Sequence, residues 1–499
     1  MKLDDLIYRD EYKSHSYVGN INIMKISTSA EEIDRETLFV VIKSIKFDVR
    51  QIINYVLNLK PAAILCDDDI EISSEDVPIL TCENTRTILP YLYSRIYRID
   101  YKKTRFIGIT GTNGKTTSAT MLEHILKALG KKTGFIGTGR ICINGRKING
   151  ISYSMTTPDP KYLYSVIREM QNEECEYIVM EVSSHALFFD KVLPIRFDVA
   201  AFTNLSDEHL DFHKNTEDYY NAKLKLFSRC DIGIFNLDDE YAKRAYSTSD
   251  CKKIGFAIHS PADVYASDIV ERGLLGTEYT FIGGKQKTRV ALHIGGVYNV
   301  YNSLVALSAA ESLGIETTVA AKALNSLEYI DGRLEIIRDR ITVIIDYAHT
   351  EKAYENLLNF LNSTKISRQK LITVFGCGGD RDKTKRAKIA SVCERFSDYV
   401  IVTTDNSRSE SSLDIIRDIL RGFSATDKRC VITSREAAIR KAILSANDGD
   451  IVAIVGKGHE RYSIDRRGIV AFDERSIIKK ALAQRGQDNE DSSGYSPHT

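Results

Sequence analysis

The sequence has no net charge and no long apolar run, and both absences narrow its function. Its 68 lysines and arginines balance 68 aspartates and glutamates, so the whole surface has no field that would attract nucleic acid or an anionic membrane. No apolar stretch approaches the ~18 residues that span a bilayer, and the first residues include acidic ones where a secretory signal is basic. We therefore expect a cytoplasmic protein, most simply a monomer, that neither binds nucleic acid nor inserts into a membrane.

The sequence also lacks the closely spaced cysteine pairs that are typical of disulfide frameworks and zinc sites. The nine cysteines are odd in number and include no C-x-x-C pair. This distribution argues against a disulfide framework and against a zinc knuckle. We expect them to be reduced and mostly structural.

The sequence does contain a repeated alternation of strand and helix patterns. Short β-branched apolar runs, typical of buried parallel strands, occur at residues 104–110, 176–182, 197–205 and 230–237, and again at 341–349, 370–376, 398–404, 430–434 and 450–456. Helical spacing separates them, for example in residues 118–130, which end at a helix-terminating glycine. This alternation predicts an α/β fold with doubly wound, mainly parallel sheets.

The length and these patterns predict three domains. At about 150 residues per domain, 499 residues correspond to about three. We assign a small α/β domain to residues 1–99, a central domain to 100–330 and a second doubly wound domain to 331–483. The polar residues 484–499 are expected to be a disordered tail.

The segment TGTNGKTT (110–117) lies between a predicted strand and a predicted helix. Small residues let successive backbone N–H groups surround a phosphate at the helix N-terminus, while Lys115 adds a positive charge and Thr116 a hydroxyl for Mg²⁺. The motif departs from the common G-x-x-x-x-G-K-[ST] pattern, because Ile109 occupies the first glycine position. An ordinary glycine turn is the alternative. The order of strand, loop and helix favours a phosphate-binding loop made by Gly111, Thr112, Asn113, Gly114, Lys115, Thr116 and Thr117.

Acidic and histidine residues follow two further predicted strands. Glu181 lies in MEVSSHAL (180–187) and His209 in NLSDEHLDFH (204–213). Open α/β sheets bind ligands at the carboxyl ends of their strands, and a carboxylate with an imidazole can hold Mg²⁺ beside a nucleotide. The alternative for His209 is a hydrogen bond to a nearby carbonyl. Lys223 lies in a predicted helix, where composition alone predicts a solvated lysine.

Five charge-rich segments of the C-terminal half begin at or just after a predicted strand or linker. We expect their charged groups to converge on one rim, although each segment is also compatible with a solvated turn. The segments are DGRLE (331–335), DYAHT (346–350), GCGGDRDKTKR (376–386), DNSR (405–408) and GKGHE (456–460).

In this order the motifs resemble those of the Mur ligase family, and within it the diamino-acid-adding MurE type. TTPDP (156–160) and YNVYNSL (298–304) belong to the same resemblance, which runs from residue 108 to 460. It implies a UDP-sugar domain, a central ATPase domain and a C-terminal Rossmann-like domain. It also implies an enzyme that uses ATP and Mg²⁺ to join a diamino acid to UDP-N-acetylmuramoyl-L-Ala-D-Glu through an acyl phosphate, in peptidoglycan precursor synthesis.

The resemblance also assigns roles to residues. Lys115, Glu181, His209 and Lys223 would be catalytic, with Thr116 and Glu181 holding one Mg²⁺, and His209 and a carbamylated Lys223 holding a second. Asn302 would contact adenine, and Arg333 and Asp346 would complete the nucleotide site. The acceptor would contact Ser29, Thr156, Thr157, Ser184 and Lys191. The amino acid would contact Arg381, Asp405, Asn406, Arg408, Gly458 and Glu460.

In the family that the sequence resembles, an arginine at the position of Arg408 binds the distal carboxylate of meso-diaminopimelate and is usually absent from lysine-adding members, so the resemblance implies meso-diaminopimelate rather than lysine as the incoming amino acid. A guanidinium binds a carboxylate through two parallel hydrogen bonds, whereas lysine would place an ammonium group against it. Ser407 stands where the family has a proline that would hold this loop rigid.

The N-terminal segment departs from the family pattern. Thr28-Ser29-Ala30 stands where the family has D-S-R, and residues 41–51 lack the glycines of its uridine-nucleotide segment. Two alternatives therefore stay open. One is a Mur-fold ligase that acts on a different carboxylate acceptor in a specialised peptide pathway. The other is a nucleotide-binding partner protein without turnover, which we would expect to lack one of the four catalytic residues.

Overall fold

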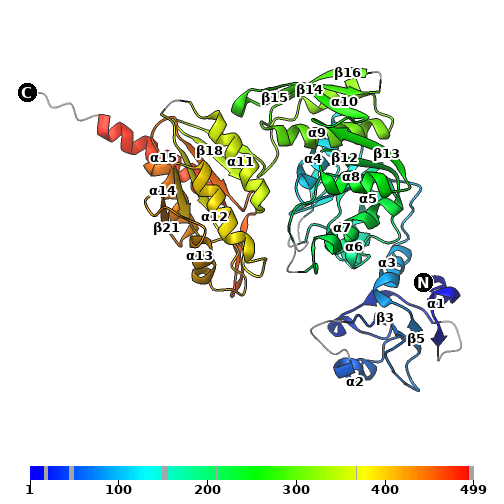
Figure 1. Ribbon diagram of the computed structural model, residues 1–499. Coiled ribbons are helices and arrows are strands. Elements are labelled where there is room, and N and C mark those ends of the chain that lie inside the picture. Colours follow the sequence, from blue (N-terminus) through cyan, green and yellow to red (C-terminus); the bar gives the residue numbers. More distant parts are fainter. Residues whose placement is uncertain are drawn as a thin grey trace, which may run out of the picture. The chain divides into compact units, whose positions relative to one another are not determined.

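The computed structural model describes residues 1–15, 21–43, 50–148, 155–208, 212–284, 286–366 and 368–493 (Figure 1). They form two compact units. The first contains Met1–Thr110, Gly130–Ala200 and Ala222–Ile232, and the second contains Gly111–Leu129, Ala201–Asn221 and Gly233–Thr499. No helix in the described part of the chain is long and apolar enough to cross a membrane.

The first unit begins with a five-stranded sheet in the order β1-β5-β4-β3-β2. Its strands are β1 (Ser14–His15), β2 (Lys25–Ser27), β3 (Thr37–Val40), β4 (Ala63–Asp67) and β5 (Ile79–Cys82), and its helices are α1 (Leu3–Leu6), α2 (Arg50–Asn58) and α3 (Thr85–Ile96). All pairs are parallel except the short β1 with β5. Val56 of α2 packs in one core with residues of β3 and β4, which gives this segment the small α/β structure that the sequence predicts.

The same unit contains the start of the central sheet. Its strands here are β6 (Arg105–Thr110), β7 (Thr133–Gly137), β8 (Arg140–Ile143), β9 (Arg146–Lys147) and β10 (Tyr177–Glu181), with helices α5 (Pro160–Asn172) and α6 (Ser184–Phe188). β10 lies between β6 and β7 and is parallel to both. β7 and β10 are buried at every position, which explains their continuous apolar runs. β11 (Phe197–Phe202), α7 (Thr216–Leu224) and β12 (Cys230–Asn236) have residues in both units.

The second unit contains the helix that follows the phosphate-binding loop. This helix, α4 (Lys115–Ala128), packs against α9 (Val297–Ser312) and α10 (Thr317–Leu324). The remaining elements of this part are α8 (Glu240–Thr248), β13 (Lys252–Ala257), β14 (Val264–Glu271), β15 (Thr277–Gly283) and β16 (Gln286–Leu292). β14, β15 and β16 are antiparallel neighbours.

The C-terminal segment of this unit contains a six-stranded sheet in the order β17-β18-β22-β19-β20-β21. Its strands are β17 (Glu335–Arg338), β18 (Thr342–Asp346), β19 (Leu371–Phe375), β20 (Tyr399–Val402), β21 (Arg429–Val431) and β22 (Ile451–Val455). Its helices are α11 (Glu351–Thr364), α12 (Thr384–Phe396), α13 (Ser412–Leu420), α14 (Arg435–Ser445) and α15 (Glu474–Ser493), and β23 (Tyr462–Asp465) and β24 (Gly468–Ala471) form a separate hairpin. Figure 1 shows α11 and α12 on one side of β18 and α14 and α15 on the other.

These elements confirm the predicted α/β fold with mainly parallel sheets. Two features differ from what the sequence predicts. The antiparallel edge strand β17 is not among the predicted strands. α15 continues past residue 484, where we expected disorder to begin, because Arg485 is buried and donates hydrogen bonds to the side chain of Asp448 and to backbone carbonyls at the end of α14.

Candidate active site

The residues predicted to bind phosphate form a tight loop at the N-terminus of α4. Gly114 is the N-cap with a φ of 88°, and Gly111 has a φ of 141°, conformations that favour glycine. A Cβ on Gly111 would lie 1.9 Å from Oγ1 of Thr203, and one on Gly114 would lie 2.4 Å from Oδ1 of Asn302. Both glycines are therefore required by backbone conformation and by close packing.

Lys115 folds back over this loop. Its Nζ donates to the carbonyl of Gly111 at 2.8 Å and to that of Thr112 at 2.9 Å. The backbone is braced by Asn204, whose carbonyl accepts from the N–H of Thr112 and whose side chain accepts from the N–H of Asn113. An ammonium group, backbone N–H groups and a helix N-terminus together form a positive environment that suits a phosphate.

Two segments of the C-terminal half, the linker DGRLE (331–335) and DYAHT (346–350), contact the same loop. Nη2 of Arg333 donates to Oγ1 of Thr116 at 3.0 Å, and Oγ1 of Thr350 donates to Oδ1 of Asn113 at 3.2 Å. The Asp346 carboxylate accepts from the backbone N–H that follows Arg333, at 2.7 Å. Burial raises the pKa of Asp346, while the positive charge of Arg333 opposes the rise. Arg333 is thus held at Thr116, and Asp346 fixes the backbone next to Arg333. Their role in binding the nucleotide stays a prediction.

His349 is part of this cluster, although the sequence analysis did not single it out. Its Nδ1 lies 3.1 Å from the carbonyl of Tyr347. Burial, together with the positive charges of Lys385, Arg333 and Lys115, lowers the pKa of His349 to about 3. The same group of cations would be neutralised by a polyphosphate. The one sequence signal for His349 is its place in the DYAHT segment, three residues after Asp346.

Asn302 lies behind the loop on α9 and is buried. Its Nδ2 donates to the side chain of Asn299 at 3.0 Å, and its Oδ1 accepts from Oγ of Ser118 at 3.4 Å. Asn302 thus lies next to the loop. Its contact with adenine stays a prediction. We use the name nucleotide cluster, after the predicted ligand, for Lys115, Thr116, Asn302, Arg333, Asp346 and His349.

Glu181, at the end of β10, has a fixed orientation within the first unit. Its Oε1 accepts from the backbone N–H of Thr138 at 2.9 Å, and its Oε2 accepts from Oγ1 of Thr138 at 3.1 Å. A Cβ on Gly137 would lie 2.3 Å from Oε1, so glycine is needed beside the carboxylate. Oγ1 of Thr138 also lies 3.0 Å from Oγ1 of Thr156. An oriented carboxylate among hydroxyl groups is chemically suited to Mg²⁺.

Four of the residues predicted to hold the acceptor peptide, namely Thr156, Thr157, Ser184 and Lys191, lie in the same unit as Glu181. Oγ1 of Thr157 donates to the Glu181 carbonyl at 2.8 Å. Ser184 is buried at the start of α6. Lys191 pairs with Asp159 at 2.6 Å. The structure thus places Thr157 against Glu181, and Thr156 against Thr138, which in turn holds the Glu181 carboxylate.

Three other predicted residues have different outcomes. Lys223 is only 1% exposed, so the composition-based prediction of a solvated lysine is wrong. It lies three and four positions after Tyr220 and Tyr219, which are also buried, and therefore shares their face of α7. Its carbamylation stays a prediction. His209 lies outside the described residues, and Ser29 is exposed after β2.

The charge-rich loops of the C-terminal half do converge on one edge. β18, β22, β19 and β20 are adjacent and parallel, and Asp346, Val455, Phe375 and Val402 lie at equivalent register positions at their carboxyl ends. The loops that follow these residues therefore leave the sheet at the same edge.

A buried lysine that the sequence analysis did not assign connects two of these loops. Nζ of Lys457 donates to Oδ1 of Asn406 at 2.7 Å and lies 3.5 Å from Asp405 and 3.7 Å from Glu460. Nδ2 of Asn406 donates to Glu460 at 2.7 Å. Burial raises the pKa of Asp405, but the cations Lys457 and Arg435 outweigh it and hold that pKa below its ordinary value. Burial and the charge of Asp405 raise the pKa of Glu460.

Arg408 lies in the same group with a left-handed backbone, at a φ of 51°. Its Nη1 donates to the carbonyl of Gly379 at 2.8 Å and approaches that of Asn406 at 3.4 Å. Among the described residues, no hydrogen-bond acceptor meets its Nε or Nη2. This edge of the guanidinium presents two parallel N–H groups, the arrangement that binds a carboxylate.

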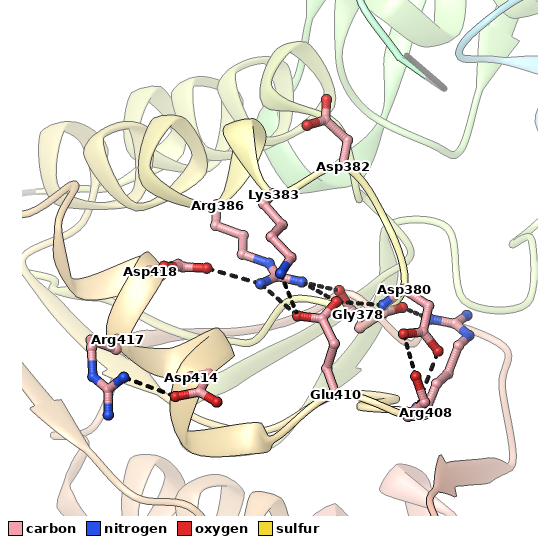
Figure 2. A network of polar contacts seen from close by, with 12 residues as sticks. Gly378, Asp380, Asp382, Lys383, Arg386, Arg408, Glu410, Asp414, Arg417 and Asp418 are labelled. Atoms are coloured by element: carbon pink, nitrogen blue, oxygen red, sulfur yellow. Dashed lines mark hydrogen bonds and ion pairs between the residues drawn. The ribbon is translucent and has the colours of Figure 1, made fainter. Parts of the chain in front are cut away.

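A buried arginine, Arg386, holds together the two loops that flank this site (Figure 2). Arg386 pairs with Glu410 and with Asp418, and it donates to the carbonyl of Gly378. Burial opposes the charge of Arg386, but these carboxylates keep its pKa above the ordinary value. Arg381, on one of these loops, is exposed.

Comparison with known proteins places this geometry in a family. Residues 109–310 match the Mur ligase middle domain, and residues 332–458 match the Mur ligase glutamate ligase domain. The UDP-N-acetylmuramoyl-L-alanyl-D-glutamate–2,6-diaminopimelate ligase of Clostridium botulinum is 36% identical over 93% of this chain and 95% of its own length. The ligase of the same name from Clostridium tetani is 35% identical over 97% of this chain and 100% of its own.

Solved structures agree with this result. A structure of a UDP-N-acetylmuramoyl-L-alanyl-D-glutamate–2,6-diaminopimelate ligase is 26% identical, with a TM-score of 0.66 over 93% of this chain and 95% of the other. The MurF ligase of Thermotoga maritima, solved in complex with ADP, is 17% identical and shares the fold, with a TM-score of 0.59 over 93% of this chain and 98% of its own. With two domain matches and relatives above 30% identity along nearly the whole chain, this protein belongs to the Mur ligase family.

Proposed function

We propose that this protein is an ATP-dependent ligase that joins meso-diaminopimelate to UDP-N-acetylmuramoyl-L-Ala-D-Glu in peptidoglycan precursor synthesis. The observation that carries the proposal is the cluster of Lys115, Thr116 and Arg333 at the N-terminus of α4, together with relatives of that name. The acceptor carboxylate attacks the γ-phosphorus of ATP and releases ADP. The amine then attacks the acyl carbon, and phosphate leaves as the amide forms.

The residues of the nucleotide cluster suit the first step. Lys115 and Arg333 bring positive charge to the loop, where they would neutralise the transferring phosphoryl group. As the family resemblance implies, Thr116 and Glu181 would hold one Mg²⁺ through a hydroxyl and a carboxylate, and His209 with a carbamylated Lys223 would hold a second. Bound Mg²⁺ would supply positive charge that offsets the charge of the phosphates.

The residues Asp405, Asn406, Arg408, Lys457 and Glu460, here called the amino-acid cluster, suit the incoming amino acid. The mixed charges of this cluster, with Arg408 and Lys457 beside Asp405 and Glu460, match the ammonium and carboxylate groups of an amino acid. The N–H edge of Arg408 would bind the distal carboxylate of meso-diaminopimelate. Arg381 would add a further positive charge, and Gly458 would let the backbone approach the substrate.

The proposal is tested by measuring ADP release with ATP, Mg²⁺, UDP-N-acetylmuramoyl-L-Ala-D-Glu and each of meso-diaminopimelate, L-lysine and L-ornithine. We expect turnover with meso-diaminopimelate. Arg408→Ala should reduce its kcat/KM about 10- to 100-fold, since one charge-assisted bidentate contact is lost. Arg417→Ala is the control, because Arg417 is exposed and pairs only with Asp414 in the structure described (Figure 2). Preference for lysine, or no loss on removing Arg408, would refute the substrate assignment.

Ser29 is exposed, and residues 28–30 and 41–51 lack the arginine and glycines of the family pattern. Two alternatives therefore stay open. A Mur-fold ligase for another carboxylate acceptor would hydrolyse ATP slowly but would not turn over UDP-N-acetylmuramoyl-L-Ala-D-Glu. A partner protein without turnover would show neither activity. We further propose three domains at residues 1–99, 100–330 and 331–483, a monomeric state and a cytoplasmic location. Each is open to direct measurement by limited proteolysis, light scattering and cell fractionation.

A further inference from the structure

Arg475, the second residue of α15, contacts two functional segments that are far apart in sequence. Its guanidinium pairs with Asp331 and Glu335, with Nε 2.9 Å from Oε1 of Glu335. Its Nη1 also donates to the carbonyl of Gly458 at 3.3 Å. Burial opposes the charge of Arg475, but these carboxylates keep its pKa above the ordinary value.

The first segment is the linker that carries Arg333 to the phosphate-binding loop. Asp331 and Glu335 lie two positions before and after Arg333, so Arg475 holds the linker on both sides of it. Glu335 also accepts from the backbone N–H of Gly332 at 2.9 Å. Gly332 has a φ of 65°, and a Cβ there would lie 2.1 Å from the backbone nitrogen of the residue after Gly458. The linker is therefore packed tightly against the second segment.

The second segment is the loop that follows β22 and carries Lys457 and Glu460. These residues hold Asn406 and face Asp405 in the amino-acid cluster. A single guanidinium thus contacts the linker of the nucleotide cluster and the loop of the amino-acid cluster. A planar group with five donors can make all of these contacts at once.

We propose that Arg475 is a positioning residue that couples ATP binding to binding of the incoming amino acid, an inference that rests on the proposed function. It contacts neither substrate. It acts through Arg333 on the nucleotide side and through the Lys457–Glu460 loop on the amino-acid side. Without Arg475, Asp331 and Glu335 lose the cation that both contact, and we expect the linker to lose its fixed position.

The test compares full-length Arg475→Ala with wild type in the ligation assay and in calorimetric titration with the non-hydrolysable analogue AMPPNP. We expect the KM values for ATP and for the amino acid, and the Kd for AMPPNP, to rise about tenfold. The KM for the acceptor should stay unchanged, because its proposed residues lie on other segments. Arg475→Lys should restore part of the loss, since an ammonium pairs with the carboxylates but cannot reach all partners together.

Arg485→Ala is the matched control on the same helix. Arg485 also anchors α15, through Asp448 and the end of α14, but it does not contact the linker or the loop. If Arg485→Ala raises the same KM values as Arg475→Ala, or if Arg475→Ala lowers only the melting temperature, the coupling role is overturned. In an Arg333→Ala background, Arg475→Ala should add little to the Kd for AMPPNP, and a full additional effect would contradict action through Arg333.

One further variant and one binding measurement keep the test independent of folding and of the proposed substrates. Asp331→Asn removes one partner of Arg475 at an exposed position and should give a smaller rise of the same kind. No change in either KM would count against the coupling. If wild type ligates no amino acid, the proposed function fails, whereas the AMPPNP titration of wild type and Arg475→Ala still decides the nucleotide half of the inference.

Discussion

Lys223 and His349 are ionisable side chains whose surroundings differ from those of solvated residues. Lys223 is buried on a helix whose composition gives no sign of it, and His349 lies among three cations. Burial, together with these cations, lowers the pKa of His349 and favours its neutral form. For Lys223, the proposed carbamylation would replace an ammonium group by an anion suited to Mg²⁺.

Lys223→Ala should therefore reduce ligation by about two orders of magnitude, because a metal-facing carboxylate group is lost. Added acetate or formate should restore part of the activity by occupying the vacated position. The measurement is the rate of ADP release with and without the added carboxylate. Lys225→Ala is the control, since Lys225 is exposed and pairs with Asp190. Normal turnover of Lys223→Ala would contradict carbamylation.

At the scale of elements, α4 shows how two glycines with positive φ serve different purposes. Gly111 precedes the helix and packs against Thr203, whereas Gly130 follows its last turn with a φ of 73° and nothing within 4 Å of its Cβ position. The first position combines strain with close contact. The second has strain alone, as expected of a helix C-terminus.

Gly111→Ala should weaken binding of ATP by more than about tenfold, because the loop must open to relieve a 1.9 Å contact. Gly130→Ala should cost only about 1 kcal/mol of stability from its backbone conformation and leave ATP affinity unchanged. Calorimetric titration with ATP and thermal unfolding of both variants provide the comparison. Equal ATP affinities in the two variants would show that the phosphate-binding loop is not where we place it.

Although the whole molecule has no net charge, positive charges are concentrated locally, as around His349. Burial, together with the cations around the predicted phosphate-binding loop, lowers the pKa of His349 from an ordinary value of 6.5 to about 3. Between these two values the unfolded chain binds a proton on this histidine and the folded chain does not. Folding stability therefore falls as the pH decreases from about 6.5 to about 3.

His349→Gln should flatten this dependence. The slope that it removes is at most about 1.4 kcal/mol per pH unit, the limit for one proton. The free energy of unfolding of wild type and variant, measured between pH 3 and pH 7, gives the difference directly. Parallel curves for the two proteins would show that His349 does not titrate as the surrounding charges require.

The local pattern of the chain was enough to predict the α/β class and the strands β6, β10, β11, β12 and β18 to β22, but not β7 or β17. It also predicts the phosphate-binding loop and the common rim of the charged loops. Each prediction depends on neighbours within a few residues, such as apolar periodicity, glycine spacing and the order of strand and helix. Only tertiary structure decided the burial of Lys223, the place of His349 and the contacts of Lys457 and Arg475. Arg333 and Thr116 are 217 positions apart, and Arg475 and Asp331 are 144 apart. Contacts over such distances depend on how the elements pack, which no local pattern of residues records.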